Sequence, residues 1–154
     1  MLTYIKNKFK NTPDYVYTIG SILAAAQINY VIVHSAFVYI VLLVMLTHEL
    51  AHYFFGKFYK GKSKLPIFLP LPFFVIAVTK VTKLGRRGRK NTALAGPVVG
   101  TLTTGLIILF NYIFNFMSYI PLVALGISEI VANYFGSDGA KYRKAKKEIK
   151  LCTF

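Results

Sequence analysis

Hydrophobic residues form two long runs along the chain, covering about residues 15–58 and 92–136. A helix needs about 20 residues to cross the hydrocarbon core of a membrane, so each run is long enough for two helices. The pattern predicts an all-α polytopic membrane protein. Its four transmembrane helices are expected at approximately residues 15–33, 36–57, 92–114 and 118–136.

The connections within the two runs are short and contain few polar residues. Near the middle of the first run, Gln27, Asn29 and His34 interrupt the apolar sequence, so the turn is expected between residues 27 and 35, with His34 in the connection or capping either helix. In the second run, residues 115–121 form an uncharged link. Each run therefore reads as a helical hairpin.

A different pattern separates the two hairpins. Residues 65–78 are apolar but contain three prolines within seven positions, which removes backbone donors and opposes a straight helix. We expect a short extended or re-entrant segment near the membrane face, although a loop covering the helix ends is an alternative. If extended, residues 73–79 would offer a strand edge that pairs with an extended substrate.

Composition and charge indicate a membrane protein and predict which side of the membrane its loops and termini face. The chain is 55% hydrophobic with 16% charged residues and a net charge of +14, which is too apolar for an ordinary soluble domain. All 19 Lys and Arg lie before residue 11, between residues 57 and 90, or between residues 141 and 150, so they share one side if each apolar run is a hairpin. The positive-inside rule makes that side the cytoplasm.

The whole chain, residues 1–154, is therefore expected to be one domain in the plasma membrane, with both termini and a basic tail (residues 140–154) in the cytoplasm. Anionic lipid headgroups are the natural partners of such basic blocks, and nucleic acid is not expected. The oligomeric state is open. Cys152 is the only cysteine, which rules out an internal disulfide, and it lies one place short of a prenylation position.

Candidate chemistry lies in the first run, in the sequence His48-Glu49-Leu50-Ala51-His52. On a helix, positions 48 and 52 are one turn apart on one face, so two imidazoles can hold one Zn²⁺ while Glu49 lies beside its water. Ionisable residues within a membrane are costly and are usually retained for function. The alternative is a chance match in which both histidines make ordinary interhelical hydrogen bonds.

A catalytic zinc site usually has three protein ligands, so a third is required. Asp138 follows the last predicted helix on the cytoplasmic side, at the expected depth of the histidines, whereas Glu129 should lie deeper in that helix. Asp138 is the better candidate. The other ring nitrogens of His48 and His52 then need partners, such as Thr47 or a backbone carbonyl.

Taken together, these motifs resemble the site-2 protease family of intramembrane zinc metalloproteases, in the form of a small prokaryotic-type member reduced to the membrane core. The matching residues are the His48–His52 motif, Ala95-Gly96-Pro97 opening the next helix, and Asn133 with Asp138-Gly139 ending the last. The resemblance implies that His48, His52 and Asp138 bind one zinc ion per chain and that Glu49 is the general base. It also implies that Asn133 holds the substrate or the developing oxyanion.

One part of the sequence departs from this family pattern. Family members usually carry a proline after the asparagine and a longer gap before the Asp-Gly pair, whereas here Gly136 would supply the helix break. Asn133 is then equally well explained as a helix-packing residue. Similarly, Gly96 and Gly100 lie four apart on one face, which favours close helix packing.

The function expected from these features is hydrolysis of a peptide bond in or beside the membrane, in a membrane-anchored regulator or a small hydrophobic peptide precursor. Two alternatives stay open. One is a non-catalytic zinc-binding membrane protein that binds a peptide, which would not need Glu49. The other is a small ion or solute carrier that uses the histidines and acidic residues as a polar path, although no internal repeat supports it.

Overall fold

The computed structural model describes residues 13–33, 35, 37–71 and 74–150. Predictions on Lys6, Lys8, Lys10, His34, Phe73 and Cys152 fall outside this part of the chain. The elements are α2 (Asp14–Val33), α3 (Phe37–Phe58), β1 (Lys62–Ser63), β2 (Ile67–Leu71), β3 (Phe74–Val78), β4 (Val81–Thr82), α4 (Arg86–Phe114), α5 (Tyr119–Phe135) and α6 (Ser137–Lys150).

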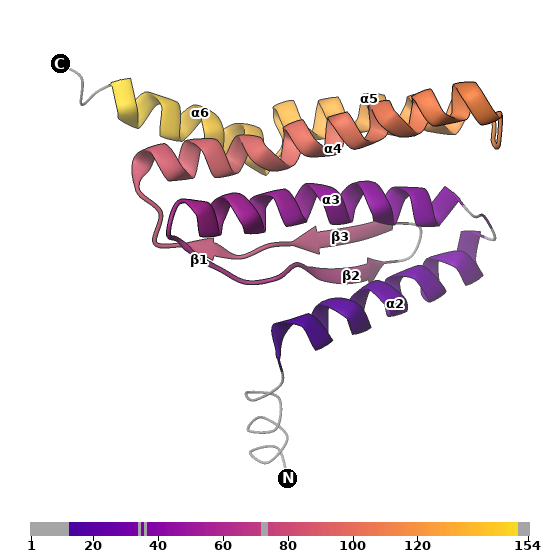
Figure 1. Cartoon of the computed structure of the whole chain (residues 1–154), viewed down its shortest axis with the longest axis horizontal. Coiled ribbons are helices and arrows are strands. Elements are labelled where there is room, and N and C mark those ends of the chain that lie inside the picture. The colour runs from indigo at the N-terminus through magenta and orange to yellow at the C-terminus, as the bar shows by residue number, and fades with distance from the viewer. Residues whose placement is uncertain (1–12, 34, 36, 72–73, 151–154) are drawn as a thin grey trace, which may run out of the picture.

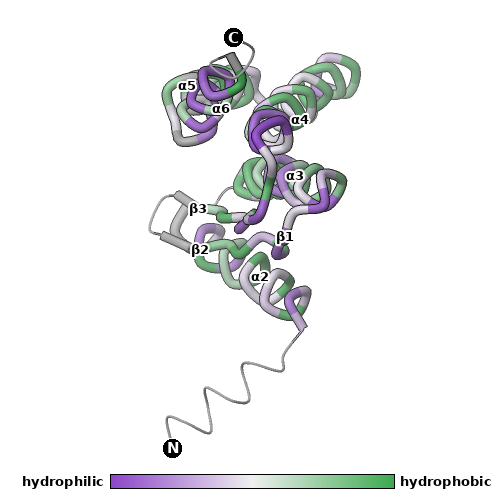
Figure 2. The backbone as a smooth tube through the Cα atoms, turned by 90° about the vertical axis from the view of Figure 1, so that its left-hand side faces the viewer, coloured by the Kyte–Doolittle hydropathy of each residue, from purple (hydrophilic) through white to green (hydrophobic). Residues whose placement is uncertain are grey.

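The elements are stacked in layers, with α2 on one side, then the β2–β3 hairpin, then α3, α4 and finally α5 with α6 (Figure 1). The end of α2, the start of α3 and the α4–α5 connection lie at one end, on the right of Figure 1. At the other end, where α3 ends and α4 begins, Figure 2 shows hydrophilic residues gathered around β1, the start of α4 and α6. The described basic residues from Lys57 onward lie in the last turn of α3, in or next to β1 and β4, in the first turns of α4, and in α6.

The predicted helices are present, with one clear difference in extent. Helix α4 begins at Arg86 rather than near residue 92, so Ala95-Gly96-Pro97 lies inside the helix and does not open it as predicted. Hydropathy detects only the apolar part of a helix, and the polar residues 86–91 simply continue it. Among the described helices, α3 and α4 are long and apolar enough to cross a membrane, and α5 holds a shorter apolar stretch, Tyr119–Val131.

The predicted extended segment is an antiparallel hairpin of β2 and β3, in which Phe68 is opposite Ala77. Its strands bury Phe68 (1% exposed) in a cluster with Ala25 of α2 and with Val38 and Leu42 of α3. The hairpin is thus wedged between two helices and does not merely cover their ends.

The proline within β2, Pro70, is explained by the direction of the backbone groups of this segment. The Phe68 N–H donates to Ser21 Oγ (3.0 Å), and the Pro66 carbonyl accepts from Thr18 Oγ1 (2.7 Å), so both groups point at α2 and away from β3. Pro70 is two residues from Phe68 and shares its orientation. Proline at this position therefore removes no donor from the β2–β3 ladder.

The basic tail predicted after residue 140 is helical as far as Lys150. Helix α5 ends at Phe135 and α6 begins at Ser137, with Gly136 in the bend between them, as the predicted helix break requires. Ala145 is 3% exposed in the packed face of α6, and Arg89 Nη2 of α4 lies 2.8 Å from Glu148 Oε2. The tail was not predicted as a helix because its polar sequence gives no apolar run.

Candidate metal centre

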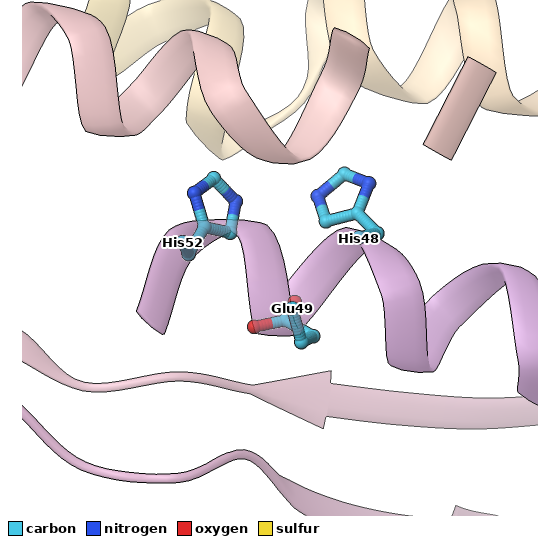
Figure 3. Close-up of side chains that lie close together, drawn as sticks. All are labelled: His48, Glu49 and His52. Atoms are coloured by element: carbon cyan, nitrogen blue, oxygen red, sulfur yellow. The ribbon is translucent and has the colours of Figure 1, made fainter. Parts of the chain in front are cut away.

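Helix α3 presents both histidines on the face that looks toward α4 and α6, while Glu49 points to the side of β3 (Figure 3). This follows from helical geometry, because positions 48 and 52 are one turn apart and position 49 is rotated by about 100°. Each of the three residues offers one atom that could bind a metal, and these three atoms lie within 4.8 Å of one another. The motif is therefore intact in space as well as in sequence.

Asp138 lies against both histidines. Its Oδ2 atom is 3.0 Å from His52 Nε2 and 3.4 Å from His48 Nε2, although these residues are 86 and 90 positions apart in the chain. The Gly136 bend turns the chain from α5 into α6 and places Asp138 in the first turn of α6. The depth argument from the sequence thus identified the acidic residue that touches both Nε2 atoms.

A backbone carbonyl sets the orientation of His52. Nδ1 of His52 lies 2.7 Å from the carbonyl oxygen of Thr92. A carbonyl only accepts, so Nδ1 carries the hydrogen and donates it, and Nε2 of the neutral ring is left with its lone pair toward Asp138. Thr47, the other predicted partner, instead donates to the Val44 carbonyl of its own helix (2.9 Å).

The distances from Asp138 Oδ2 to the two imidazole nitrogens fit a zinc ion. Zinc with bonds of about 2.0–2.1 Å in tetrahedral geometry separates any two ligand atoms by about 3.3 Å. The observed separations from Asp138 Oδ2 are 3.0 and 3.4 Å. Without a cation, a hydrogen on Nε2 of each ring has to occupy these contacts, as in hydrogen bonds from the imidazoles to the carboxylate. With both rings neutral, two imidazoles and one carboxylate form a donor set that suits Zn²⁺.

Asp138 is held in its ionised form. Burial acts to raise the pKa of this carboxyl, but hydrogen bonds with His48 and His52 and with the Lys141 ammonium outweigh burial and keep the pKa well below its usual value. The Lys141 Nζ atom is 2.9 Å from Oδ1, the oxygen that faces away from the histidines. Metal ligands must be deprotonated, so Asp138 meets this requirement at neutral pH.

Two glycines of α4 make room for the histidine rings. A Cβ atom on Gly96 would lie 2.6 Å from His52 Cε1 and 2.7 Å from His48 Cδ2, far inside contact distance. On Gly100 it would lie 3.0 Å from His48 Nδ1. The prediction of close packing on this small-residue face is confirmed, and what approaches the glycines is the histidine pair itself.

Glu129 and Asn133 lie on the far side of His48. Glu129 Oε2 is 3.6 Å from His48 Nδ1, and Asn133 Nδ2 donates to the same oxygen at 3.1 Å. Glu129 therefore faces the ring nitrogen that points away from Asp138. Sequence reasoning missed this contact. The spacing of Glu129 and Asn133, one helical turn apart, was the signal that could have suggested a polar pair.

Two cavities meet at Asp138. The first, of about 420 Å³, is lined by residues of α3, β3, α4 and α6 that include Glu49, His52, Thr79 and Lys144. The second, of about 590 Å³, has a mostly apolar lining from α4, α5 and α6. Its apolar residues include Leu94, Pro97, Val98, Leu102 and Ile130, and Asn133 also lines it. The first cavity thus has a mixed polar and apolar lining, and the second is mostly apolar.

Comparison with known proteins identifies no relative, because no family model, curated protein or solved structure matches this chain.

Proposed function

We propose that this chain is an intramembrane zinc metallopeptidase of the site-2 protease type. The observation that carries the proposal is the convergence of His48 and His52 with Asp138, from a distant helix, at the separations expected of zinc ligands. His48, His52 and Asp138 would hold the metal, and Glu49 would act beside it. The donor set, the deprotonated carboxylate and the adjacent cavity are each what such a centre needs.

The proposed setting is the plasma membrane, with α2, α3, α4 and α5 as the four spans and both chain ends in the cytoplasm. Helices α3 and α4 are long and apolar enough for this, and α4 exposes a row of large apolar side chains. The row includes Leu94, Val98, Leu102, Leu106, Leu109 and Ile113, which are 41–62% exposed. Exposed apolar surface of this extent favours contact with lipid, and the basic end would face anionic headgroups.

The proposed chemistry divides between the metal and the chain. Zinc, when bound, lowers the pKa of water and polarises a peptide carbonyl. Glu49 would take the proton from the attacking water and later deliver it to the leaving amine. Thr92 fixes the ring of His52, and the partly polar cavity beside Glu49 would give water access from the cytoplasmic end.

The substrate is proposed to bind in extended form along β3. Phe68 points its N–H away from β3, so the opposed residue Ala77 points its N–H and carbonyl away from β2. Among the described residues β3 pairs only with β2, and Ala77 lines the cavity beside Glu49. A peptide bond has to leave its helical hydrogen bonds before attack, and this free edge offers it partners.

Substitution of Ala77 tests this edge. Ala77→Pro removes the outward N–H, so cleavage of a peptide reporter should fall at least about tenfold, the equivalent of one lost hydrogen bond of about 1.4 kcal/mol. Zinc content should be unchanged. Ala77→Ser, which keeps the N–H, is the matched control. Equal cleavage by the Pro variant, with a normal melting temperature, would remove strand pairing from the proposal.

The main test of function is cleavage by purified protein in liposomes that carry a single-span reporter substrate. We expect about one zinc per chain, loss of cleavage on chelation, and recovery when zinc is restored. Asp138→Asn should weaken zinc binding and cleavage together, because a neutral amide oxygen replaces an anionic ligand. Control protein with Asn115→Asp, changed at the opposite end of α4, should retain both properties.

The outcomes separate this proposal from the alternatives. Wild-type protein that binds zinc but cleaves no membrane peptide under any condition would indicate a non-catalytic binding protein. Zinc-sensitive solute flux without cleavage would indicate a carrier. Wild-type protein with no bound zinc would exclude the metal centre itself.

A further inference from the structure

His48 has a different second partner from His52. His52 donates its Nδ1 hydrogen to a neutral backbone carbonyl, whereas His48 Nδ1 faces the carboxylate of Glu129 at 3.6 Å. The side chains of His48 and Glu129 are only 12% and 15% exposed, so water screens this contact little. The two ligands of the candidate centre are thus held by groups of different charge.

The Glu129 carboxylate is itself fixed in place. Asn133, one turn later on α5, donates from Nδ2 to Glu129 Oε2 at 3.1 Å, and this is the oxygen that faces His48. The opposing surface of α4 is open only because residue 100 is glycine. A Cβ there would lie 3.0 Å from both Glu129 Oε2 and His48 Nδ1. Three helices therefore converge on one imidazole nitrogen.

We propose that Glu129 and Asn133 form a positioning pair for His48, with Glu129 accepting the Nδ1 hydrogen and Asn133 orienting the carboxylate. The inference rests on the proposed metal centre and deepens it. It gives Asn133 a role that differs from substrate or oxyanion binding: it donates one of its two amide hydrogens to Glu129.

The physical reason lies in the two nitrogens of an imidazole. When Nε2 offers its lone pair to a metal, the hydrogen is on Nδ1, and a carboxylate that accepts this hydrogen fixes the ring and increases its basicity. Removal of such a partner typically weakens metal binding or activity by about 10–100-fold. Glu129 should therefore affect the affinity for metal without being a ligand.

The test measures zinc affinity of the full chain in detergent by competition with a chelator, together with the visible spectrum of bound Co²⁺. Glu129→Ala should weaken zinc binding about 10–100-fold and alter the Co²⁺ bands while one metal per chain still binds. Glu129→Gln should lose less zinc affinity than Glu129→Ala, because the amide oxygen of Gln can still accept the Nδ1 hydrogen of His48. Glu148→Gln, which removes a charge from the cavity without contacting His48, should bind like wild type.

A double-mutant cycle separates the two roles of Asn133. Asn133→Ala should weaken zinc binding in the wild-type background but have little further effect in the Glu129→Ala background, since it acts through Glu129. An Asn133→Ala protein with wild-type zinc affinity and a reduced kcat would overturn the pair and return Asn133 to the substrate.

Two other results bear on the proposal. If Glu129→Ala binds no metal while Asp138→Asn binds it normally, Glu129 is a ligand and the positioning role is wrong. If the wild-type protein binds zinc and neither Glu129→Ala nor Asn133→Ala changes the affinity, this inference is overturned but the proposed metal centre is not. Absence of zinc from wild-type protein overturns the proposed function as well.

Discussion

Replacing Glu49 by Gln is expected to remove cleavage and to leave the metal bound. The substitution keeps the size of the side chain but gives an amide that cannot take a proton from water. Glu49 points to the side of β3, whereas both histidine rings point toward α4, and one ligand atom of Glu49 lies within 4.8 Å of those of the histidines. General acid–base groups contribute about 10²–10⁴-fold to a rate, so the single-turnover rate should fall by that factor.

The measurement is cleavage of a reporter peptide in liposomes, with zinc determined on the same preparations. Glu148→Gln is the control, because Glu148 lines the same cavity but pairs with Arg89 and contacts neither histidine. It should cleave at a rate close to that of wild type. An active Glu49→Gln protein would exclude Glu49 as the base, and loss of its zinc would make Glu49 a ligand.

The arrangement of His48, Glu49 and His52 could be predicted because it is local. The helical period alone fixes which of the three residues share a face, and a long apolar run makes a helix the expected structure. The position of Asp138 was also accessible, because two helical hairpins bring residues 48–52 and 138 to similar depth. No non-local contact had to be known in detail for either inference.

The contact of Glu129 with His48 could not be obtained in the same way. Depth along the helix axis indicated that Glu129 lies farther than Asp138 from the basic end of the molecule, but it did not show which ring nitrogen it faces. That depends on how closely α3 and α4 approach, which the absence of a side chain at Gly96 and Gly100 determines. The sequence showed that these small residues form a packing face, but it did not show which side chains they pack against.

The fold prediction missed polar helical segments and the details of strand pairing. Apolar runs mark the parts of a helix that avoid water, so the polar first turns of α4 and the basic helix α6 gave no signal. The prolines indicated an extended segment between the hairpins. The outer edge of that segment is bonded by Thr18 and Ser21, residues almost 50 positions away in α2. Strand pairing is non-local and the sequence pattern alone does not specify it.

Gly96→Ala is expected to destroy the metal centre with one added methyl group. That group would collide with both imidazoles, at 2.6 Å from His52 Cε1 and 2.7 Å from His48 Cδ2, and also with His52 Nε2. The rings would have to move by about 1 Å to reach ordinary contact distance, whereas zinc sites tolerate deviations of about 0.2 Å. We expect zinc affinity to fall by more than about 100-fold, beyond the loss caused by removing an outer partner, and cleavage to fall with it.

Gly105→Ala is the matched control, because it makes the same change in the same helix at a position with no neighbouring atom within 4 Å. Alanine favours a helix over glycine by about 0.5–1 kcal/mol, so both variants gain intrinsic helix stability and neither loses it. A loss of zinc in Gly96→Ala alone therefore reports the collision with the histidines rather than a weakened helix. If Gly96→Ala binds zinc and cleaves like Gly105→Ala, the close approach of α4 to these rings is not part of the functional state, and the ligand geometry proposed for His48 and His52 is wrong.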